Sequence, residues 1–225
     1  MFGYQNIGLV GSRLANAFSP RLARAPSDFD LTHQLNLNWI ADLPFGKGRA
    51  LASNDSGVVD AFTGGWQFSG IARWTSGFPF SVEGGQRWPT DWFLTAVTQM
   101  TTRPKTGTFK GNGTVNVFAD PASAQQDFTS PLPGQVGSRN ILRGDGYAGL
   151  DMSLAKSWKM PYNEAHGIQF RWEVFNVLNL TRFNAQGIGS SSLLTSLTQS
   201  PNSFGAYTSL LTQPRVMQFA LRYEF

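Results

Sequence analysis

One stretch near the start of the chain, residues 31–43, alternates apolar and polar residues. Six of its seven odd-numbered positions are apolar and five of its six even-numbered positions are polar. Successive side chains of a β-strand point to opposite faces, whereas a helix would scatter these residue types around its circumference. The pattern therefore predicts a strand with one apolar and one polar face.

The same alternation recurs four more times along the chain. The further stretches are residues 66–76, 148–159, 167–179 and 214–225. One residue interrupts the apolar side of the third stretch, namely Lys156. The last stretch keeps its alternation up to the final residue, Phe225, although chain termini are usually polar and frayed. The sequence thus predicts an all-β fold with five strands.

The connections between these strands alternate in length. Residues 44–65 and 160–166 form shorter links, whereas 77–146 and 181–213 are long, irregular and rich in turn-forming residues. Loops of that length argue against a compact soluble domain. Short turns at one end and long loops at the other are typical of an antiparallel outer-membrane β-barrel. Residues 1–30, 77–146 and 181–213 are accordingly predicted to be extracellular loops.

Composition narrows the class of protein. Charged residues make up 14% of the 225 positions, and the chain holds 24 Gly, 18 Phe and 7 Trp, which favours β structure with many turns. No stretch approaches the roughly 20 consecutive apolar residues of a membrane-spanning helix. The absence of cysteine excludes disulfides and thiolate chemistry. A net charge of +4 without a basic run argues against nucleic-acid binding.

The two faces of the predicted strands differ in character. Aromatic residues near the strand ends of the apolar faces suit an interfacial girdle in a membrane, although a soluble β-sandwich also buries tryptophan. These girdle residues are Trp39, Trp66, Trp74, Trp158 and Trp172. The residues predicted to face a water-filled lumen are Gln67, Arg73, Asp151, Arg171, Glu173 and Arg222. Arg171 and Glu173 are neighbours on this face and could pair across the wall with Asp151 or Arg222.

Five strands are too few to close a spanning barrel, since single-chain barrels use at least about eight. Unpaired edge groups in lipid cost several kcal/mol each, by order of magnitude. Either the remaining strands come from sequence outside this chain, or the protein is not a barrel.

Several sequence blocks carry a resemblance to a known family. They are Ser27-Asp28-Phe29-Asp30 with His33, Leu43-Pro44-Phe45-Gly46-Lys47-Gly48-Arg49, Gly65-Trp66-Gln67 with Ser76-Gly77-Phe78-Pro79-Phe80, Arg139-Asn140-Ile141-Leu142-Arg143-Gly144 with Asp151, Ser153 and Lys156, and Phe175-Asn176-Val177-Leu178-Asn179 with Phe183-Asn184. In this order the chain resembles the C-terminal end of TonB-dependent outer-membrane receptors. The likeness is greatest to the Oar-like group, in which a carboxypeptidase-regulatory-like domain precedes plug and barrel.

The resemblance implies a function in energised uptake of a bulky ligand across the outer membrane. Residues 1–225 would form part of a barrel of about 22 strands, and the chain is expected to be truncated or fragmentary because it shows no signal peptide and no plug. The implied partners are outer-membrane lipid, the barrel-assembly machinery and, through missing N-terminal regions, a TonB-type energy transducer. The residues implied as the C-terminal assembly signal are Phe219, Leu221, Tyr223 and Phe225.

The sequence offers little for bond chemistry. His33 and His166 are the only histidines, and neither has a metal-binding neighbour at the next helical turn, so neither a zinc site nor a catalytic histidine is expected. No metal, cofactor or enzymatic activity is predicted. Asp28 and Asp30 are interpreted as solvated loop carboxylates or turn caps rather than calcium ligands.

Two asparagines, Asn176 and Asn179, flank the outer end of the fourth strand, where amide side chains can end strand pairing by bonding to local backbone. Two other functions stay open from sequence alone. The chain could be a secreted all-β carbohydrate- or ligand-binding module that uses loop 77–146, or a soluble β-rich enzyme, although no nucleophile and base can be paired.

Overall fold

The structure is a computed structural model that describes residues 16–51, 57–111, 113–160, 163–185, 188, 194–196 and 203–225. The chain divides into two compact units. Unit 1 consists of Met1–His33, Thr75–Tyr147 and Arg182–Leu211, and unit 2 consists of Gln34–Trp74, Ala148–Thr181 and Thr212–Phe225.

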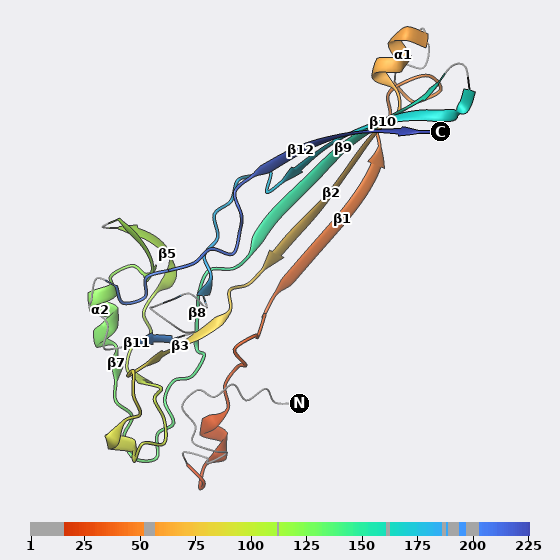
Figure 1. The fold of residues 1–225 in the computed structure, drawn as a ribbon. Coiled ribbons are helices and arrows are strands. Elements are labelled where there is room, and N and C mark those ends of the chain that lie inside the picture. Colours follow the sequence, from red (N-terminus) through yellow and green to blue (C-terminus); the bar gives the residue numbers. More distant parts are fainter. Residues whose placement is uncertain are drawn as a thin grey trace. The chain divides into compact units, whose positions relative to one another are not determined.

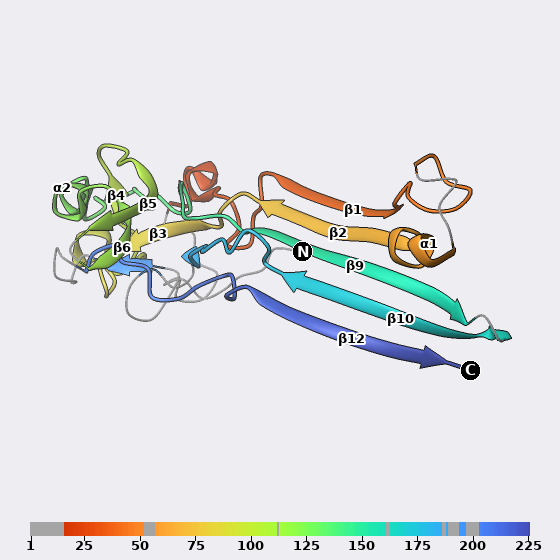
Figure 2. The same ribbon diagram turned by 90° about the horizontal axis from the view of Figure 1, so that it is seen from above.

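Unit 2 is built on one sheet of five long strands, which lie side by side in Figures 1 and 2. The strands are β1 (Gln34–Asp42), β2 (Trp66–Thr75), β9 (Ala148–Met160), β10 (Asn163–Phe175) and β12 (Val216–Glu224). Their order in the sheet is β1-β2-β9-β10-β12. β9 pairs antiparallel with both β2 and β10, and β10 pairs antiparallel with β12. The predicted all-β, antiparallel fold is confirmed.

The fourth strand differs most from its predicted bounds of 167–179. It begins at Asn163, because the pairing of β9 and β10 continues through a register irregularity between Asn163 and Gly167. It ends at Phe175, because Asn176 adopts a left-handed backbone conformation with φ of 50°. Only residues 161 and 162 separate β9 from β10.

The connections of the sheet differ between its two ends. At the end marked by Asp42 and Glu224, here called the turn end, β1 and β2 are linked through a segment that contains the short helix α1 (Gly57–Thr63). At the opposite end, here called the loop end, each of the five strands is connected along the chain to a segment of unit 1. The expected asymmetry of short turns and long loops is therefore present in the chain's connectivity.

Unit 1 consists of short elements. They are η1 (Pro20–Ala23), β3 (Pro79–Glu83), η2 (Pro89–Asp91), β4 (Gln99–Met100), β5 (Thr106–Gly111), β6 (Thr114–Phe118), α2 (Pro121–Gln126), β7 (Phe128–Thr129), β8 (Leu142–Arg143) and β11 (Leu194–Ser196). β3 lies between β11 and β8, while β4 pairs with β7 and β5 pairs with β6. Asp120 caps α2, since its carboxylate accepts hydrogen bonds from the backbone amides of Ala122 and Ser123.

A hydrophobic core holds unit 1 together. Phe118 stacks on Phe204, with ring centroids 5.3 Å apart. The Phe80 and Phe128 rings also contact the Phe118 ring, with centroid distances of 6.2 and 6.3 Å. All four rings are buried. Within the described residues, 77–146 and 181–213 contain short strands and helices instead of irregular chain, and aromatic residues far apart in sequence converge on one core. That these segments form extracellular loops stays a prediction.

Candidate functional site

The register of the sheet in unit 2 aligns the two faces of its strands. Residues directly opposite each other in antiparallel strands share a face. Trp66 of β2 faces Lys156 of β9, which in turn faces Phe170 of β10, and Phe170 faces Leu221 of β12. The apolar halves of the four strands therefore form one continuous surface, here called the apolar face.

The five predicted girdle tryptophans all lie on the apolar face. Register places four of them there, and Trp39 joins them because its ring packs against Phe68, with ring centroids 6.1 Å apart, and over Gly70. A Cβ atom on Gly70 would collide with the indole, so this position requires glycine. Trp66, Trp74, Trp158 and Trp172 lie near an end of their own strands, whereas Trp39 lies next to the midpoint of β1. That these rings sit at a headgroup boundary stays a prediction.

Lys156 is the charged residue that interrupts the apolar side of β9. In the structure its ammonium contacts two aromatic rings and two backbone carbonyls. Its side chain is 2% exposed and its ammonium lies 5.0 Å from the Trp66 ring centroid and 5.2 Å from that of Trp158. The ammonium donates hydrogen bonds to the backbone carbonyls of Phe62, at 3.3 Å, and Gly64. A buried ammonium needs such acceptors, so the helix end of α1 accounts for the lysine on this face.

The six residues predicted to face a lumen all lie on the opposite side, here called the polar face. Register places Gln67, Arg73, Asp151, Arg171, Glu173 and Arg222 together there. Their predicted pairing was wrong. Arg171 pairs with Glu173 of its own strand at 3.5 Å, because alternate residues on a strand share a face, and Arg222 pairs with Glu224 at 3.2 Å.

Asp151 bonds to the backbone instead of to a charged side chain. Its carboxylate accepts a hydrogen bond of 2.8 Å from the Asn176 amide. The Asn176 side chain then donates to the carbonyls of Leu180 and Gln213 at 3.0 and 2.7 Å, and accepts from the Leu180 amide at 2.9 Å. The prediction that asparagine amides end β10 is confirmed for Asn176.

A hollow of about 320 Å³ opens on the polar face near the turn end. The polar side chains that line it include those of Asp42, Arg49, Gln67, Ser157 and Gln169. Gln67 donates a hydrogen bond of 3.2 Å to Asp42, and Arg49 lies 3.8 Å from the same carboxylate. These groups can bind water or a polar chain segment, and they contain no paired nucleophile and base.

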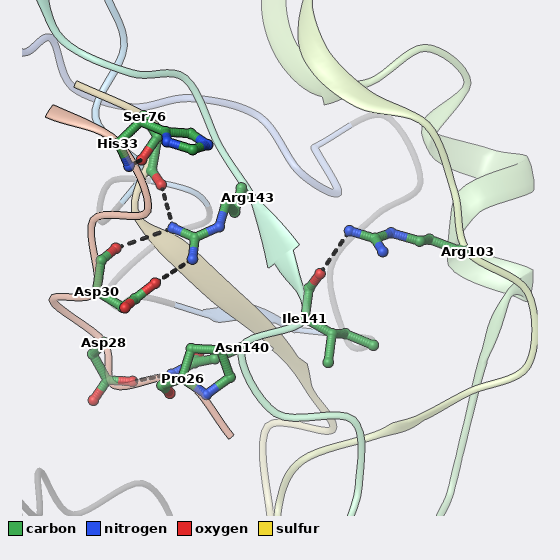
Figure 3. Close-up of polar contacts among 10 residues, drawn as sticks. Pro26, Asp28, Asp30, His33, Ser76, Arg103, Asn140, Ile141 and Arg143 are labelled. Atoms are coloured by element: carbon green, nitrogen blue, oxygen red, sulfur yellow. Dashed lines mark hydrogen bonds and ion pairs between the residues drawn. The ribbon is translucent and has the colours of Figure 1, made fainter. Parts of the chain in front are cut away.

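In unit 1, a network of polar contacts joins the segment before β1 to the segment around β8 (Figure 3). Asp28 is buried, accepts a hydrogen bond of 2.6 Å from the Asn140 side chain and lies 3.4 Å from the Arg139 guanidinium. Asp30 forms an ion pair with Arg143. The interpretation as a solvated carboxylate was wrong for Asp28, which is buried where two of the resemblance blocks fold against each other, whereas the Asp30 side chain is 41% exposed.

The arginines of this network also bind backbone. Arg143 donates to the carbonyls of Asp30 and Gly77, at 3.0 and 2.9 Å, while Arg103 donates to the Ile141 carbonyl at 3.0 Å. His33 is tied to Ser76 through backbone and hydroxyl bonds of 2.9 and 3.2 Å. The cluster thus anchors chain segments to one another.

Sequence reasoning missed the polar groups inside unit 1. Asp145 pairs with Arg182 at 3.2 Å and accepts from the Phe183 amide at 3.0 Å. The Tyr207 hydroxyl donates to the Gly107 carbonyl at 3.1 Å, and burial raises the pKa of Tyr207. Burial also raises the pKa of Glu83 to about 7. No periodic pattern marks these positions, so only the fold brings them together.

Two absences hold for the described part of the chain. None of its helices has the length and apolar content needed to cross a membrane. The described ranges also contain no group of three or more metal-binding side chains arranged around a common point.

The sheet of unit 2, with one apolar and one polar face, long connections at one end and turns at the other, defines the class: part of a β-barrel wall. The comparison with known families agrees with this class. Residues 2–218 match the outer membrane beta barrel domain family, and the chain belongs to that family. The protein is located in the outer membrane. No curated protein and no solved structure matches the chain.

Proposed function

We propose that the chain forms part of the barrel wall and loop region of a TonB-dependent outer-membrane receptor of the Oar-like group, which takes up a bulky ligand. The observation that carries the proposal is the aligned register of the five-stranded sheet, which separates its apolar and polar faces. The proposal assigns no bond chemistry to the protein.

In this proposal the apolar face contacts lipid. Leu35, Leu37, Phe219 and Leu221 are exposed there, and large contiguous apolar surfaces of this kind mark interaction sites. Lipid removes the cost of exposing them to water, whereas the charged groups of the polar face keep their hydration in a water-filled lumen. The family assignment to the outer membrane favours this over the secreted binding module.

The sheet needs additional strands. β1 and β12 are its outer strands, each hydrogen-bonded to one neighbour within the sheet. An open edge in hydrocarbon leaves backbone groups without partners, at a cost of several kcal/mol each by order of magnitude. Strands from outside this sheet would therefore pair with β1 and β12 in the membrane.

The contacts between sequence blocks support the resemblance to TonB-dependent receptors. The block around Asp28 bonds to that around Asn140, and Asp151 bonds to the backbone of Asn176. Blocks that are separated in sequence but pair in space have a structural reason to occur in a fixed order. The energy transducer would act through regions outside this chain.

The last strand suits recognition by the barrel-assembly machinery. Phe219, Leu221 and Tyr223 are exposed on one face of β12, and the exposed Phe225 directly follows the strand. The His166 ring and the Tyr223 hydroxyl bond at 2.6 Å, which ties this end to β10. Recognition of the strand by the assembly machinery is part of the proposal.

Protease digestion of intact cells tests the orientation. Lys105 and Lys110 of unit 1 and Lys47 and Arg49 at the turn end are all exposed. If the loop end faces outward, trypsin added to intact cells should cut after the first pair only, and after the second pair once the outer membrane is permeabilised. Cleavage after Lys47 in intact cells, with unit 1 protected, would overturn the proposed orientation.

Uptake is tested in the same cells with labelled cobalamin, a ferric siderophore, an oligosaccharide and a peptide. The proposal expects accumulation of one of these to depend on the protein and to stop when an uncoupler collapses the proton gradient. Accumulation of a probe that depends on the protein but not on the gradient would contradict a TonB-dependent mechanism.

A further inference from the structure

We propose that α1 is an interfacial helix: its Val58 and Phe62 side chains insert at the boundary between headgroups and acyl chains of the leaflet at the turn end, and Lys156 holds the helix in that position. The inference rests on the proposed contact between apolar face and lipid, and it adds a second, helical lipid contact to the wall.

Hydrogen bonds from the apolar face hold α1 in place. The Trp158 indole N–H donates to the Ala61 carbonyl at 2.6 Å, and the Trp66 indole N–H donates to the Phe62 carbonyl at 2.9 Å. Because both tryptophans belong to the apolar face, the helix is tied to the side of the sheet that carries the exposed apolar residues.

Lys156 adds a positive charge at the same point. The last carbonyls of a helix have no partner within the helix and carry partial negative charge. The Lys156 ammonium binds the carbonyls of Phe62 and Gly64 at the end of α1, between the rings of Trp66 and Trp158. The lysine therefore fixes where the helix ends relative to β9.

The two sides of α1 differ. Asp60 points toward the preceding turn, where its carboxylate accepts a hydrogen bond of 2.5 Å from the Lys47 amide. Val58 and Phe62, one helical turn apart, share a side and are each 74% exposed. A helix at a membrane surface is expected to have a polar side that bonds to protein and an apolar side that is exposed, as Val58 and Phe62 are in the described part of the chain.

Lipid is expected to contact the exposed side of α1, because the helix is attached to the apolar face of the sheet. Trp66, Trp158 and Lys156 form the anchor of α1 and also part of that face. Indole rings and lysine stems favour the headgroup level, because each combines an apolar body with a polar end. A helix fixed to this belt places its exposed Val58 and Phe62 at the same depth.

Spin labelling of the cysteine-free chain tests the inference. Single-cysteine variants are made at Phe62, at Leu221 on the apolar face and at Arg73 on the polar face. The full chain is bound to phosphatidylethanolamine–phosphatidylglycerol vesicles and recovered by flotation, and the accessibility of each label to oxygen and to a water-soluble nickel chelate is measured.

We expect the label at position 62 to resemble that at 221, with high oxygen and low nickel accessibility, and to differ from that at 73. If 221 and 73 differ as expected but 62 resembles 73, the helix does not contact lipid and the inference fails alone. If 221 and 73 give the same values, the proposed wall fails, and the inference fails with it.

A second variant tests the positioning role of Lys156. Lys156→Met in the Phe62→Cys background should raise the mobility of the label and shift its oxygen accessibility toward the value at 73. Lys159→Met, which removes an exposed lysine from the same strand, is the matched control and should leave both unchanged. An unaltered spectrum in Lys156→Met would show that the lysine does not hold α1.

Discussion

Units 1 and 2 are both rich in strands and aromatic residues, yet they treat their apolar side chains differently. In unit 1 the rings of Phe80, Phe118 and Phe204 are buried against one another. In unit 2 the strands form one sheet whose outer apolar residues, such as Phe219 and Leu221, are exposed. The first unit completes its core with its own residues, whereas the second needs a surrounding phase to cover its apolar face.

This difference shows that strand formation and burial are separate steps. Alternation decides that a segment is a two-faced strand, but not what covers the apolar face. Unit 1 reaches its core through short strands, turns and the capped helix α2, whereas unit 2 extends its strands and leaves the apolar residues of its outer strands exposed. Matched substitutions in the two units should therefore have unequal effects.

The largest effect is expected for a core phenylalanine of unit 1. Phe118 is 1% exposed. Phe118→Ala removes buried apolar surface and leaves a cavity, so it should lower the free energy of unfolding of unit 1 by about 3–5 kcal/mol. Hydrogen exchange of the full chain, read by mass spectrometry on peptides that cover β3 and β6, measures this change.

Phe219→Ala is the matched change in unit 2. Phe219 is 67% exposed, although it stacks on Trp172 at 6.0 Å. We expect the exchange of β3 and β6 to stay as in the unchanged chain. A loss of protection in unit 1 as large as that caused by Phe118→Ala would contradict the division into two units with separate apolar contacts.

The next effect concerns the two aspartates of the polar network. The Asp28 side chain is 8% exposed and that of Asp30 is 41% exposed. Asp28→Ala removes one of the two acceptors of the Asn140 amide, which keeps its bond to the Pro26 carbonyl, and leaves the Arg139 charge without its partner, so it should destabilise unit 1 by about 2–4 kcal/mol. Asp30→Ala breaks a more exposed ion pair and should cost about 1 kcal/mol or less.

The same exchange experiment compares the two aspartate variants. Equal losses of protection would mean that burial does not distinguish Asp28 from Asp30. A larger loss for Asp30→Ala would reverse the ranking and identify the Arg143 ion pair as the main anchor of the network.

Sequence reasoning was most informative for unit 2, because long strands in a sheet with two unlike faces carry a regular period. The alternation located the strands and sorted Trp66 from Gln67 onto opposite faces. It could not explain Lys156, since the partner of that residue is the end of a helix about ninety positions earlier in the chain. It also assigned the wrong ion-pair partners to Arg171. Register determines which residues share a face, but the choice of an ion-pair partner also depends on side-chain conformations.

Unit 1 could not be predicted from pattern, for a physical reason. Several of its strands contain two or three residues, too few to show a period. Its core joins Phe80 to Phe204, which lie far apart in the chain. Asp28 looked like a loop carboxylate because its partners, Arg139 and Asn140, are equally distant in sequence.

The smallest expected effect, a pH dependence confined to unit 1, comes from Glu83. Burial raises its pKa from 4.5 to about 7, and its Oε1 atom has no hydrogen-bond partner among the described residues. The folded state therefore holds the proton more tightly than the unfolded state. Stability from this group is fully present below pH 4.5 and is lost as the pH rises to about 7, by about 1 kcal/mol after discounting for solvent screening.

Glu83→Gln should remove this dependence, because the amide stays neutral at every pH. Urea unfolding of the full chain, followed by a fluorophore on a cysteine introduced at the exposed Lys110 of unit 1, measures it at pH 4.5, 6 and 8. The variant should match the unchanged chain at pH 4.5 and exceed its stability by about 1 kcal/mol at pH 8. Asp127→Asn, which removes the same charge elsewhere in unit 1, is the control and should show no such divergence. If Glu83→Gln is less stable than the unchanged chain at pH 8, the carboxylate makes a favourable charged contact, and its burial does not penalise ionisation.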